Sequence, residues 1–86
     1  MYEFLLYKRW GDRHMQDRIG KSVGERIKYL RKKHGISQEE MAKKLFVSCS
    51  STIAKYELNK RVPPMHIVLG YSRIFNVSTD WILKGD

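Results

Sequence analysis

The sequence predicts an all-α fold, a bundle of five short helices that follows an N-terminal extension. Two Ser-x-x-Glu capping boxes mark the starts of helices, and apolar residues recur at helical spacing in the segments that follow them. The strand-like stretch from Tyr2 to Tyr7 has no second strand with which to pair. A chain of 86 residues accommodates one small domain rather than two.

The first helix is predicted over residues 23–33, because Ser22 and Glu25 form one of the capping boxes. Ile27 and Leu30 share one face of this helix and are expected in the core. Gly35 stands where a left-handed C-cap belongs. The basic residues are expected to spread over the other faces and to crowd the last turn, where the helix dipole favours cations: Arg26, Lys28, Arg31, Lys32 and Lys33.

The second and third helices are predicted to be short. The second begins at the capping box of Ser37 and Glu40 and runs from Gln38 to about Leu45. Its inward side chains are Met41, Ala42 and Leu45. A hydroxyl-rich run at residues 48–52 offers several possible N-caps to the third helix, which reaches about Glu57. The buried side of the third helix consists of Ile53 and Tyr56.

The fourth and fifth helices complete the bundle. A proline is well suited to the first turn of a helix, so the fourth helix is predicted from Pro64 to Phe75. Its apolar face is Val68, then Tyr71 or Ser72, and Phe75. Asn76 ends this helix, and Ser78 caps a fifth helix over residues 79–83. The fifth helix supplies two side chains to the core, Trp81 and Ile82.

The first 21 residues form a separate extension whose structure the pattern leaves open. Tyr2, Phe4 and Leu6 alternate with their neighbours as in a strand, whereas residues 10–18 are polar without clear periodicity. A lone strand leaves its backbone groups unpaired. The extension is therefore disordered, helical against the bundle, or paired with the same segment of a second copy. A further alternative is that Met15 is the true start of the protein.

The composition favours a cytoplasmic protein with an anionic partner. The chain has 17 Lys and Arg against 9 Asp and Glu, a formal charge of +8, which favours nucleic acid. No apolar run suits a membrane helix or a signal peptide. One cysteine and three scattered histidines offer neither a disulfide nor zinc-ligand spacing, so no metal, cofactor or small-molecule ligand is expected. Catalytic constellations are also lacking, and an enzyme is not expected.

The feature that points to function is the tight pair formed by the second and third helices. An α-helix fits the major groove of DNA, and short polar residues at its N-terminal end let the backbone approach base edges. The third helix opens with such residues, so we expect Ser50, Ser51 and Lys55 on the DNA side. Helix ends and the following loop offer amides and cations to phosphates: Gln38, Asn59, Lys60 and Arg61.

Three stretches follow one another in an informative order: VGERIKYLRKKHGISQEEMAKKL, TIAKYELNKRVPP and IFNVSTDWILKGD. With these motifs, the chain from Val23 to Asp86 resembles the phage-repressor or Cro-like (XRE-type) helix-turn-helix DNA-binding family. The resemblance implies a five-helix, lambda-repressor-like domain over residues 22–86, in which the third helix is the recognition helix.

The resemblance also implies roles for individual residues. Gln38 would hold a backbone phosphate and brace the recognition helix, while Arg31 and Glu57 would form a buried ion pair between the first and third helices. The implied base contacts are Ser50, Ser51, Thr52 and Lys55. The implied phosphate contacts are Gln38, Ser48, Asn59, Lys60 and Arg61.

The chain departs from the family pattern in the turn before the recognition helix. Phe46 occupies a position where the family usually has glycine, and a bulky residue with positive φ is costly there. One extra residue stands between Val47 and Ile53, where VSCSSTI compares with a family pattern such as VSRSTI. Either the turn is longer or the third helix starts earlier. This choice of register decides whether Cys49 and Thr52 lie inside or outside the DNA groove. A redox role for Cys49 is not expected, since only the helix N-terminus would lower its pKa.

The favoured function is a sequence-specific DNA-binding transcriptional regulator, a repressor that binds a palindromic operator in double-stranded DNA as a homodimer. The alternative is an antitoxin-like or other protein-binding module that uses the helical domain and the aromatic segment from Tyr2 to Trp10. Deleting residues 1–14 distinguishes them, because the deletion abolishes partner capture in the second case and leaves half-site recognition intact in the first.

Overall fold

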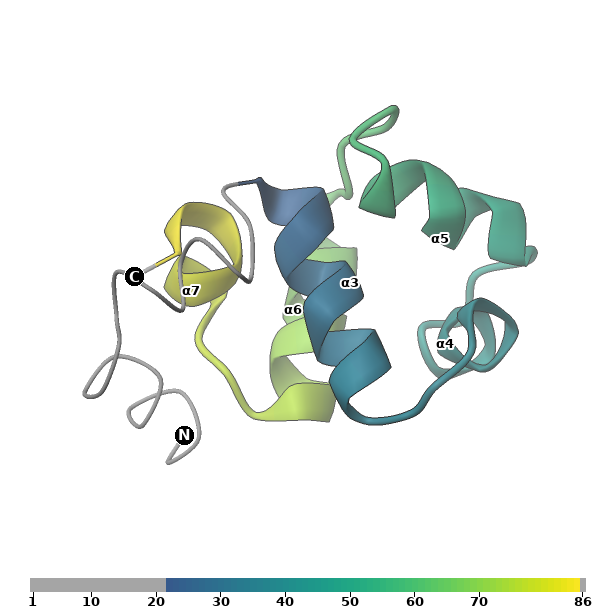
Figure 1. Ribbon diagram of the computed structural model, residues 1–86, viewed down its shortest axis with the longest axis horizontal. Helices are drawn as coiled ribbons and strands as arrows, with labels where there is room; N and C mark the ends of the chain where they lie inside the picture. The colour runs from purple at the N-terminus through teal and green to yellow at the C-terminus, as the bar shows by residue number, and fades with distance from the viewer. Residues whose placement is uncertain (1–21, 86) are drawn as a thin grey trace.

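A computed structural model describes residues 22–85, which form five α-helices and no strand (Figure 1). In chain order these are α3 (Val23–Lys33), α4 (Gln38–Lys44), α5 (Ser50–Glu57), α6 (Met65–Phe75) and α7 (Thr79–Lys84). The prediction of an all-α, five-helix fold is confirmed. The alternatives for the extension at residues 1–21, and for Met15 as a start, lie outside the described residues.

Helix α3 lies at the centre of the domain, with α4 and α5 on one side of it and α7 on the other (Figure 1). Ser22 and Ser37 start α3 and α4 as predicted, although the reciprocal bond of a capping box is present only at α4. The Ser22 side chain accepts from the Glu25 backbone N–H at 3.1 Å, and the Ser37 side chain accepts from the Glu40 N–H at 3.0 Å. Each cap satisfies a backbone donor that the first turn of a helix leaves unpaired.

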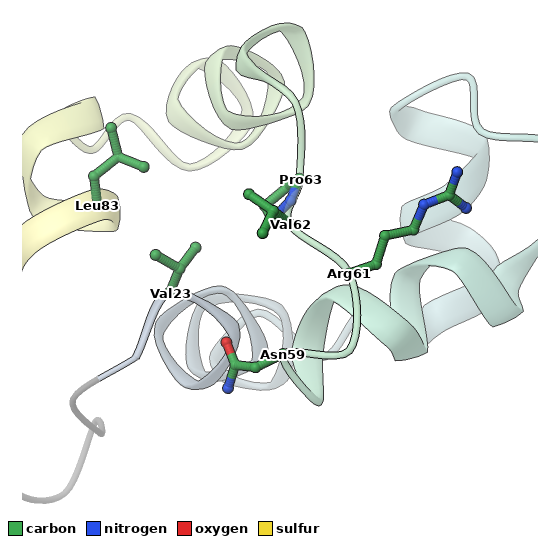
Figure 2. A pocket seen from close by; sticks show the side chains of 6 residues that line it. All are labelled: Val23, Asn59, Arg61, Val62, Pro63 and Leu83. Atoms are coloured by element: carbon green, nitrogen blue, oxygen red, sulfur yellow. The ribbon is translucent and has the colours of Figure 1, made fainter.

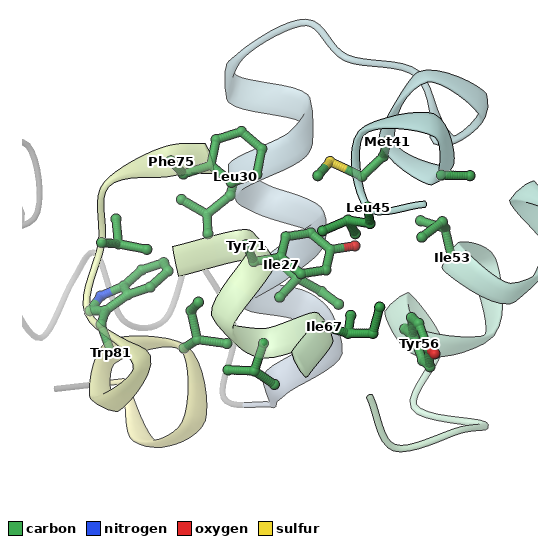
Figure 3. Close-up of a cluster of buried hydrophobic side chains, with 14 residues drawn as sticks. Ile27, Leu30, Met41, Leu45, Ile53, Tyr56, Ile67, Tyr71, Phe75 and Trp81 are labelled. Carbon is green, nitrogen blue, oxygen red and sulfur yellow. The ribbon is translucent and has the colours of Figure 1, made fainter. Parts of the chain in front are cut away.

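The core contains side chains from all five helices (Figure 3). From α6 they include Ile67, which the predicted apolar face lacked, and the fully buried Tyr71. Tyr71 therefore takes the core position for which Ser72 was the alternative. The core residues are Ile27, Leu30, Met41, Ala42, Leu45, Ile53, Tyr56, Ile67, Val68, Tyr71, Phe75, Val77, Trp81 and Ile82.

The predicted start of α6 was wrong, and for α5 the structure defines one N-cap among those that the sequence left open. Pro64 is the N-cap of α6 rather than its first residue, with extended backbone at ψ 164°, so the helix begins at Met65. Cys49, rather than one of the hydroxyl residues around it, is the N-cap of α5, and its side chain makes no capping hydrogen bond. Ser50 and Ser51 therefore lie in the first turn of α5, where their hydroxyls are not used as caps.

Arg26 was expected on a polar face of α3 but is buried, with 3% of its surface exposed. Its guanidinium donates to two carbonyls near the end of α7, through Nε to Ile82 O at 2.7 Å and through Nη2 to Leu83 O at 3.0 Å. The last carbonyls of a helix have no partner within the helix, and a cation complements the negative end of the helix dipole. Arg26 thus joins the beginning of α3 to the end of α7.

Each of the five described helices is followed by a residue in the left-handed conformation: Gly35, Phe46, Asn59, Asn76 and Gly85, with φ of 66°, 58°, 60°, 55° and 84°. Glycine and asparagine are the usual residues for this conformation. Phe46 is the exception. Its backbone N–H bonds to Lys43 O at 3.2 Å and the next N–H, of Val47, bonds to Ala42 O at 2.8 Å. This hydrogen-bond pair is the Schellman motif that ends α4.

Replacing Phe46 with glycine is expected to raise the free energy of unfolding by about 1 kcal/mol. A bulky residue in this conformation strains the folded state by roughly 1–3 kcal/mol, and glycine relieves that strain. Glycine also gives the unfolded chain more conformational entropy, which lowers the stability by about 0.4–1 kcal/mol. The Phe46 side chain is 96% exposed, so little buried apolar surface is lost. Urea denaturation measures the effect. Asn76→Gly is the control, with no gain expected, and an unchanged or lower stability of Phe46→Gly would contradict the strain.

Candidate nucleic-acid interface

The candidate interface is built around the first turn of α5, which stands after a short, well-defined turn. Helix α4 ends at Leu45, the left-handed Phe46 reverses the chain, and three residues lead to the start of α5 at Ser50. The Thr52 N–H bonds to Cys49 O at 3.2 Å, which closes the first turn of α5. Helix α5 therefore starts at Ser50, with Cys49 as its N-cap.

Helix α5 separates a buried face from an exposed face. Ile53 and Tyr56 are buried against the core, with 0% and 5% of their surfaces exposed. Ser51 and Lys55 are both exposed, and residues four apart lie on the same side of a helix. Ser50 and Thr52 are half-buried beside them. The predicted base-contact residues therefore occupy the beginning of α5 and its exposed side.

Cys49 lies at the tip of this surface and is fully exposed. Its Sγ is 2.9 Å from Ser51 Oγ and 3.7 Å from Thr52 Oγ1. The hydrogen bond with the Ser51 hydroxyl, and after it the one with the Thr52 hydroxyl, lowers the pKa of the thiol from its ordinary value to about 7. The expectation that only the helix N-terminus would act on this thiol was wrong, because the two hydroxyls stabilise the thiolate directly.

Alkylation of Cys49 is therefore expected to reach half of its maximal rate near pH 7. The thiolate is the reactive form, so the rate follows its population. The chain has a single cysteine, and uptake of iodoacetamide reports on this position alone. The same protein in urea is the control and should titrate near the ordinary value of about 8.5. Ser51→Ala should move the folded midpoint upward, and identical midpoints in the folded and unfolded protein would refute the effect of the hydroxyls.

Glu57, at the end of α5, is the centre of a buried polar cluster. Its Oε2 lies 2.6 Å from Arg31 Nε, and its Oε1 accepts from Arg31 Nη2 and from Gln38 Nε2, each at 3.0 Å. Arg31 also donates through Nη1 to Ile36 O at 2.8 Å. The carboxylate thus receives donors from α3 and from the first residue of α4. These contacts fix the orientation of α5 relative to α3 and α4.

The side chain of Asn59 is used within the protein. Its Oδ1 accepts from the Gly24 N–H at 3.0 Å and its Nδ2 donates to Ser22 Oγ at 2.9 Å, so it caps the beginning of α3. A Cβ on Gly24 would lie 2.6 Å from two carbonyl oxygens at the end of α5, which explains the glycine at this close approach. Asn59 therefore positions the loop against α3, and because the residue is exposed and Nδ2 has a second hydrogen, its phosphate contact stays a prediction.

Exposed cations follow Asn59 in the loop after α5. Lys60 and Arg61 are both exposed, and the backbone N–H of Lys60 bonds to Lys55 O at 2.9 Å, which holds the start of the loop against α5. On the other side, Ser48 is exposed on the rim of a groove of about 410 Å³ between α4 and the start of α5. Groups suited to phosphates thus lie at both ends of α5.

Other kinds of site receive no support from residues 22–85. In this range no group of His, Cys, Asp or Glu side chains is arranged to hold a metal ion. Within the same residues, no helix has the length and apolar character needed to cross a membrane. The geometry of α4 and α5 is that of two short helices around a tight turn, with the second helix exposed at its N-terminal end.

Residues 24–86 match the family model described as a helix-turn-helix domain. The chain belongs to this family. It is 38% identical over 65 residues to the HTH-type transcriptional regulator ImmR of Bacillus subtilis, a match that covers 76% of this chain and 50% of ImmR. The chain spans about half the length of the curated relatives that it matches.

Solved structures show the same fold. The P22 c2 repressor in complex with a synthetic operator superposes on this helix-turn-helix domain with a TM-score of 0.71 and 34% identity, covering 78% of this chain and 100% of that one. The N-terminal DNA-binding domain of SinR from Bacillus subtilis superposes with a TM-score of 0.62 and 31% identity, covering 70% and 87% of the respective chains. The lambda-repressor-like fold predicted from the motifs is confirmed.

Proposed function

We propose that this helix-turn-helix domain is a sequence-specific transcriptional repressor that binds double-stranded DNA in the cytoplasm through α5. The observation that carries the proposal is the first turn of α5, where Ser51 is exposed on the same side as Lys55 and Ser50 and Thr52 are half-buried beside it. A helix of this kind enters the major groove with its N-terminal residues against base edges. The structure of the P22 c2 repressor, a structural neighbour, contains a synthetic operator, which supports the same mode of binding here.

The proposed base contacts are the exposed or half-buried residues on the DNA side of α5. Hydroxyls of Ser50, Ser51 and Thr52 are short enough to let the helix backbone approach the bases. Lys55, one turn later, reaches acceptors on guanine. Cys49 joins them because it is the exposed N-cap, a position that the sequence left open.

Phosphate contacts are proposed on both sides of this tip. Lys60 and Arg61 neutralise phosphates after α5, and Ser48 donates a hydrogen bond before it. Gln38 uses one amide hydrogen to hold Glu57, and its second amide hydrogen suits a phosphate oxygen at the positive end of α4. Asn59 orients the loop through its bonds to α3, and its second Nδ2 hydrogen suits a phosphate oxygen.

A homodimer is proposed from an apolar depression on the side of the domain where the loop after α5 meets α3 and α7 (Figure 2). The depression has a volume of about 150 Å³ and is lined mainly by Val23, Val62, Pro63 and Leu83. Val62 is 86% exposed and Leu83 39% exposed. Two copies that meet on this side bury apolar surface and place two recognition helices about 34 Å apart, which suits a palindromic operator.

The dimer is tested by sedimentation of the protein with a palindromic duplex. Two chains are expected to bind each duplex cooperatively, and Val62→Asp should convert this to independent binding of single chains. Leu69→Asp is the matched control, since Leu69 is a partly exposed apolar residue of α6 that does not line the depression. Cooperative binding of two chains by the Val62→Asp variant would contradict the proposal that the dimer forms through this depression.

The experiment that tests the function is selection of binding sites from a random duplex pool, followed by affinity measurements between 50 and 200 mM salt. A preferred sequence is expected, and the logarithm of affinity should fall with the logarithm of salt concentration by about 0.9 for each phosphate neutralised. Repression is then measured with a promoter that carries the selected site. Binding without sequence preference at every salt concentration would contradict the proposal.

A further inference from the structure

A second exposed surface lies between the α4–α5 turn and α6. It is a groove of about 430 Å³ lined by Lys44, Leu45, Phe46, His66, Gly70, Arg73 and Ile74. None of these residues belongs to the groove of about 410 Å³ between α4 and α5 that forms part of the proposed DNA interface. A volume of this size falls within the roughly 300–1,000 Å³ typical of pockets that bind ligands. We call this surface the α6 groove.

The apolar part of the α6 groove is unusually accessible. Phe46 is 96% exposed and Ile74 38% exposed, while Leu45 forms the floor beside Gly70. A Cβ on Gly70 would lie 2.5 Å from Leu45 Cδ2, so the glycine allows α6 to approach the turn closely and keeps the groove shallow in this place. Large apolar side chains exposed together in this way mark interaction surfaces more often than isolated ones do.

Phe46 adds an independent observation, because its left-handed backbone is strained and the corresponding position in the other helix ends is glycine or asparagine. Within residues 22–85 the exposed ring gains no burial that would offset the strain. Strained residues that persist in a fold cluster at ligand clamps and binding sites. The ring of Phe46 is therefore free to contact a partner outside the described domain.

The charges around the groove indicate the chemistry of the occupant. Lys44, Arg73 and His66 lie on its walls, and no acidic side chain lines it. In the described part of the chain none of these three side chains forms an ion pair. A second copy of this chain would bring the same cations to the same place. The extension at residues 1–21 carries more basic than acidic side chains. An acidic segment of another protein complements the walls.

We propose that the α6 groove binds an acidic segment of a partner protein that inserts a large apolar side chain against Phe46 and Ile74. The cations at Lys44 and Arg73 pair with carboxylates that flank the anchor. Duplex DNA would satisfy the cations but would leave the aromatic ring and its apolar floor against phosphates, so a protein segment fits the observations better. This partner is additional to the proposed DNA-binding function and uses a different face of the domain.

Three short synthetic peptides test the proposal by NMR titration of the full chain. The first carries a Trp–Leu anchor flanked by Asp and Glu, the second has Ala in place of the anchor, and the third has Lys in place of the acids. Only the first is expected to bind, with the largest shifts at the amides of Phe46, Gly70 and Arg73. Binding by none of the peptides, or equal binding by the second, would overturn the proposal.

Variants then locate the binding. Phe46→Gly and Arg73→Glu should each weaken the first peptide about tenfold, as expected for residues that dominate an interface. Phe46→Gly removes strain and stays folded, and its affinity for a selected duplex should match that of the unaltered chain. Leu58→Ala is the control, since Leu58 is 60% exposed and lies outside the groove. Unchanged affinity of Phe46→Gly for the first peptide would overturn the proposal. So would a duplex that displaces this peptide and itself shifts the amide signals of the α6 groove.

Discussion

Replacing Arg31 with Met is expected to lower the free energy of unfolding by about 3–5 kcal/mol, because it leaves the Glu57 carboxylate buried without its main partner. Glu57 is 4% exposed, and Arg31 supplies two of the three hydrogen bonds that reach its oxygens. A small domain has roughly 5–15 kcal/mol of total stability. The variant should therefore be partly unfolded at 37 °C, and urea denaturation at a lower temperature measures the change.

The double variant Arg31→Met with Glu57→Leu separates the cost of an unpaired charge from the value of the pair. Replacing both members of a buried pair by apolar residues is often neutral or stabilising. Most of the lost stability should thus return in the double variant, because no buried charge remains. Lys32→Met is the control for α3, since Lys32 is exposed and surface changes usually stay within about 0.5 kcal/mol. Equal stability of Arg31→Met and this control would show that the pair does not hold α3 against α5.

The second large effect concerns recognition of bases by Lys55. Lys55→Ala is expected to reduce the preference for the selected duplex over a scrambled one by about 1–3 kcal/mol. The reason is that Lys55 lies on the exposed side of α5 together with Ser51, where its ammonium can donate to guanine. Affinities for both duplexes are measured at one salt concentration, so that the ratio reports specificity rather than general attraction.

Lys60→Ala provides the matched comparison, since it removes the same side chain from an exposed position in the loop after α5. This variant should weaken binding to both duplexes similarly and reduce the salt slope by about 1. Lys55→Ala is thus expected to lower the specificity for the selected duplex, whereas Lys60→Ala lowers the affinity for both duplexes. Similar losses of specificity from both variants would contradict the assignment of α5 to the bases and the loop to phosphates.

Most of the fold could be predicted because its signals are local. Ser22 with Glu25 and Ser37 with Glu40 place two helix starts within four residues of sequence each, and the structure contains both. Asn76 ends α6 for an equally local reason, its tolerance of the left-handed conformation. The N-cap of α5 was left open because five adjacent small residues offer similar caps, and the structure selects Cys49.

The unpredicted parts of the site depend on contacts between distant residues. Arg26 looks like one of many surface cations in α3, and only the arrival of α7 carbonyls more than 50 residues later gives it a buried role. Asn59 suits a phosphate loop by type, but the folded chain brings Ser22 and Gly24 to its amide first. The spacing of apolar residues predicts which face of a helix is buried. It does not predict which polar side chain will bond to the end of another helix.

Protection of Cys49 from alkylation by a selected duplex tests the central claim most directly. The thiol is the only cysteine of the chain and sits at the exposed N-cap of α5, so its reaction with iodoacetamide reports on the tip of the recognition helix alone. If the tip enters the major groove, a saturating duplex should slow the reaction at least about tenfold at pH 7, because DNA blocks access and its negative charge disfavours the thiolate. An unchanged rate on fully bound protein would show that α5 does not face the bases.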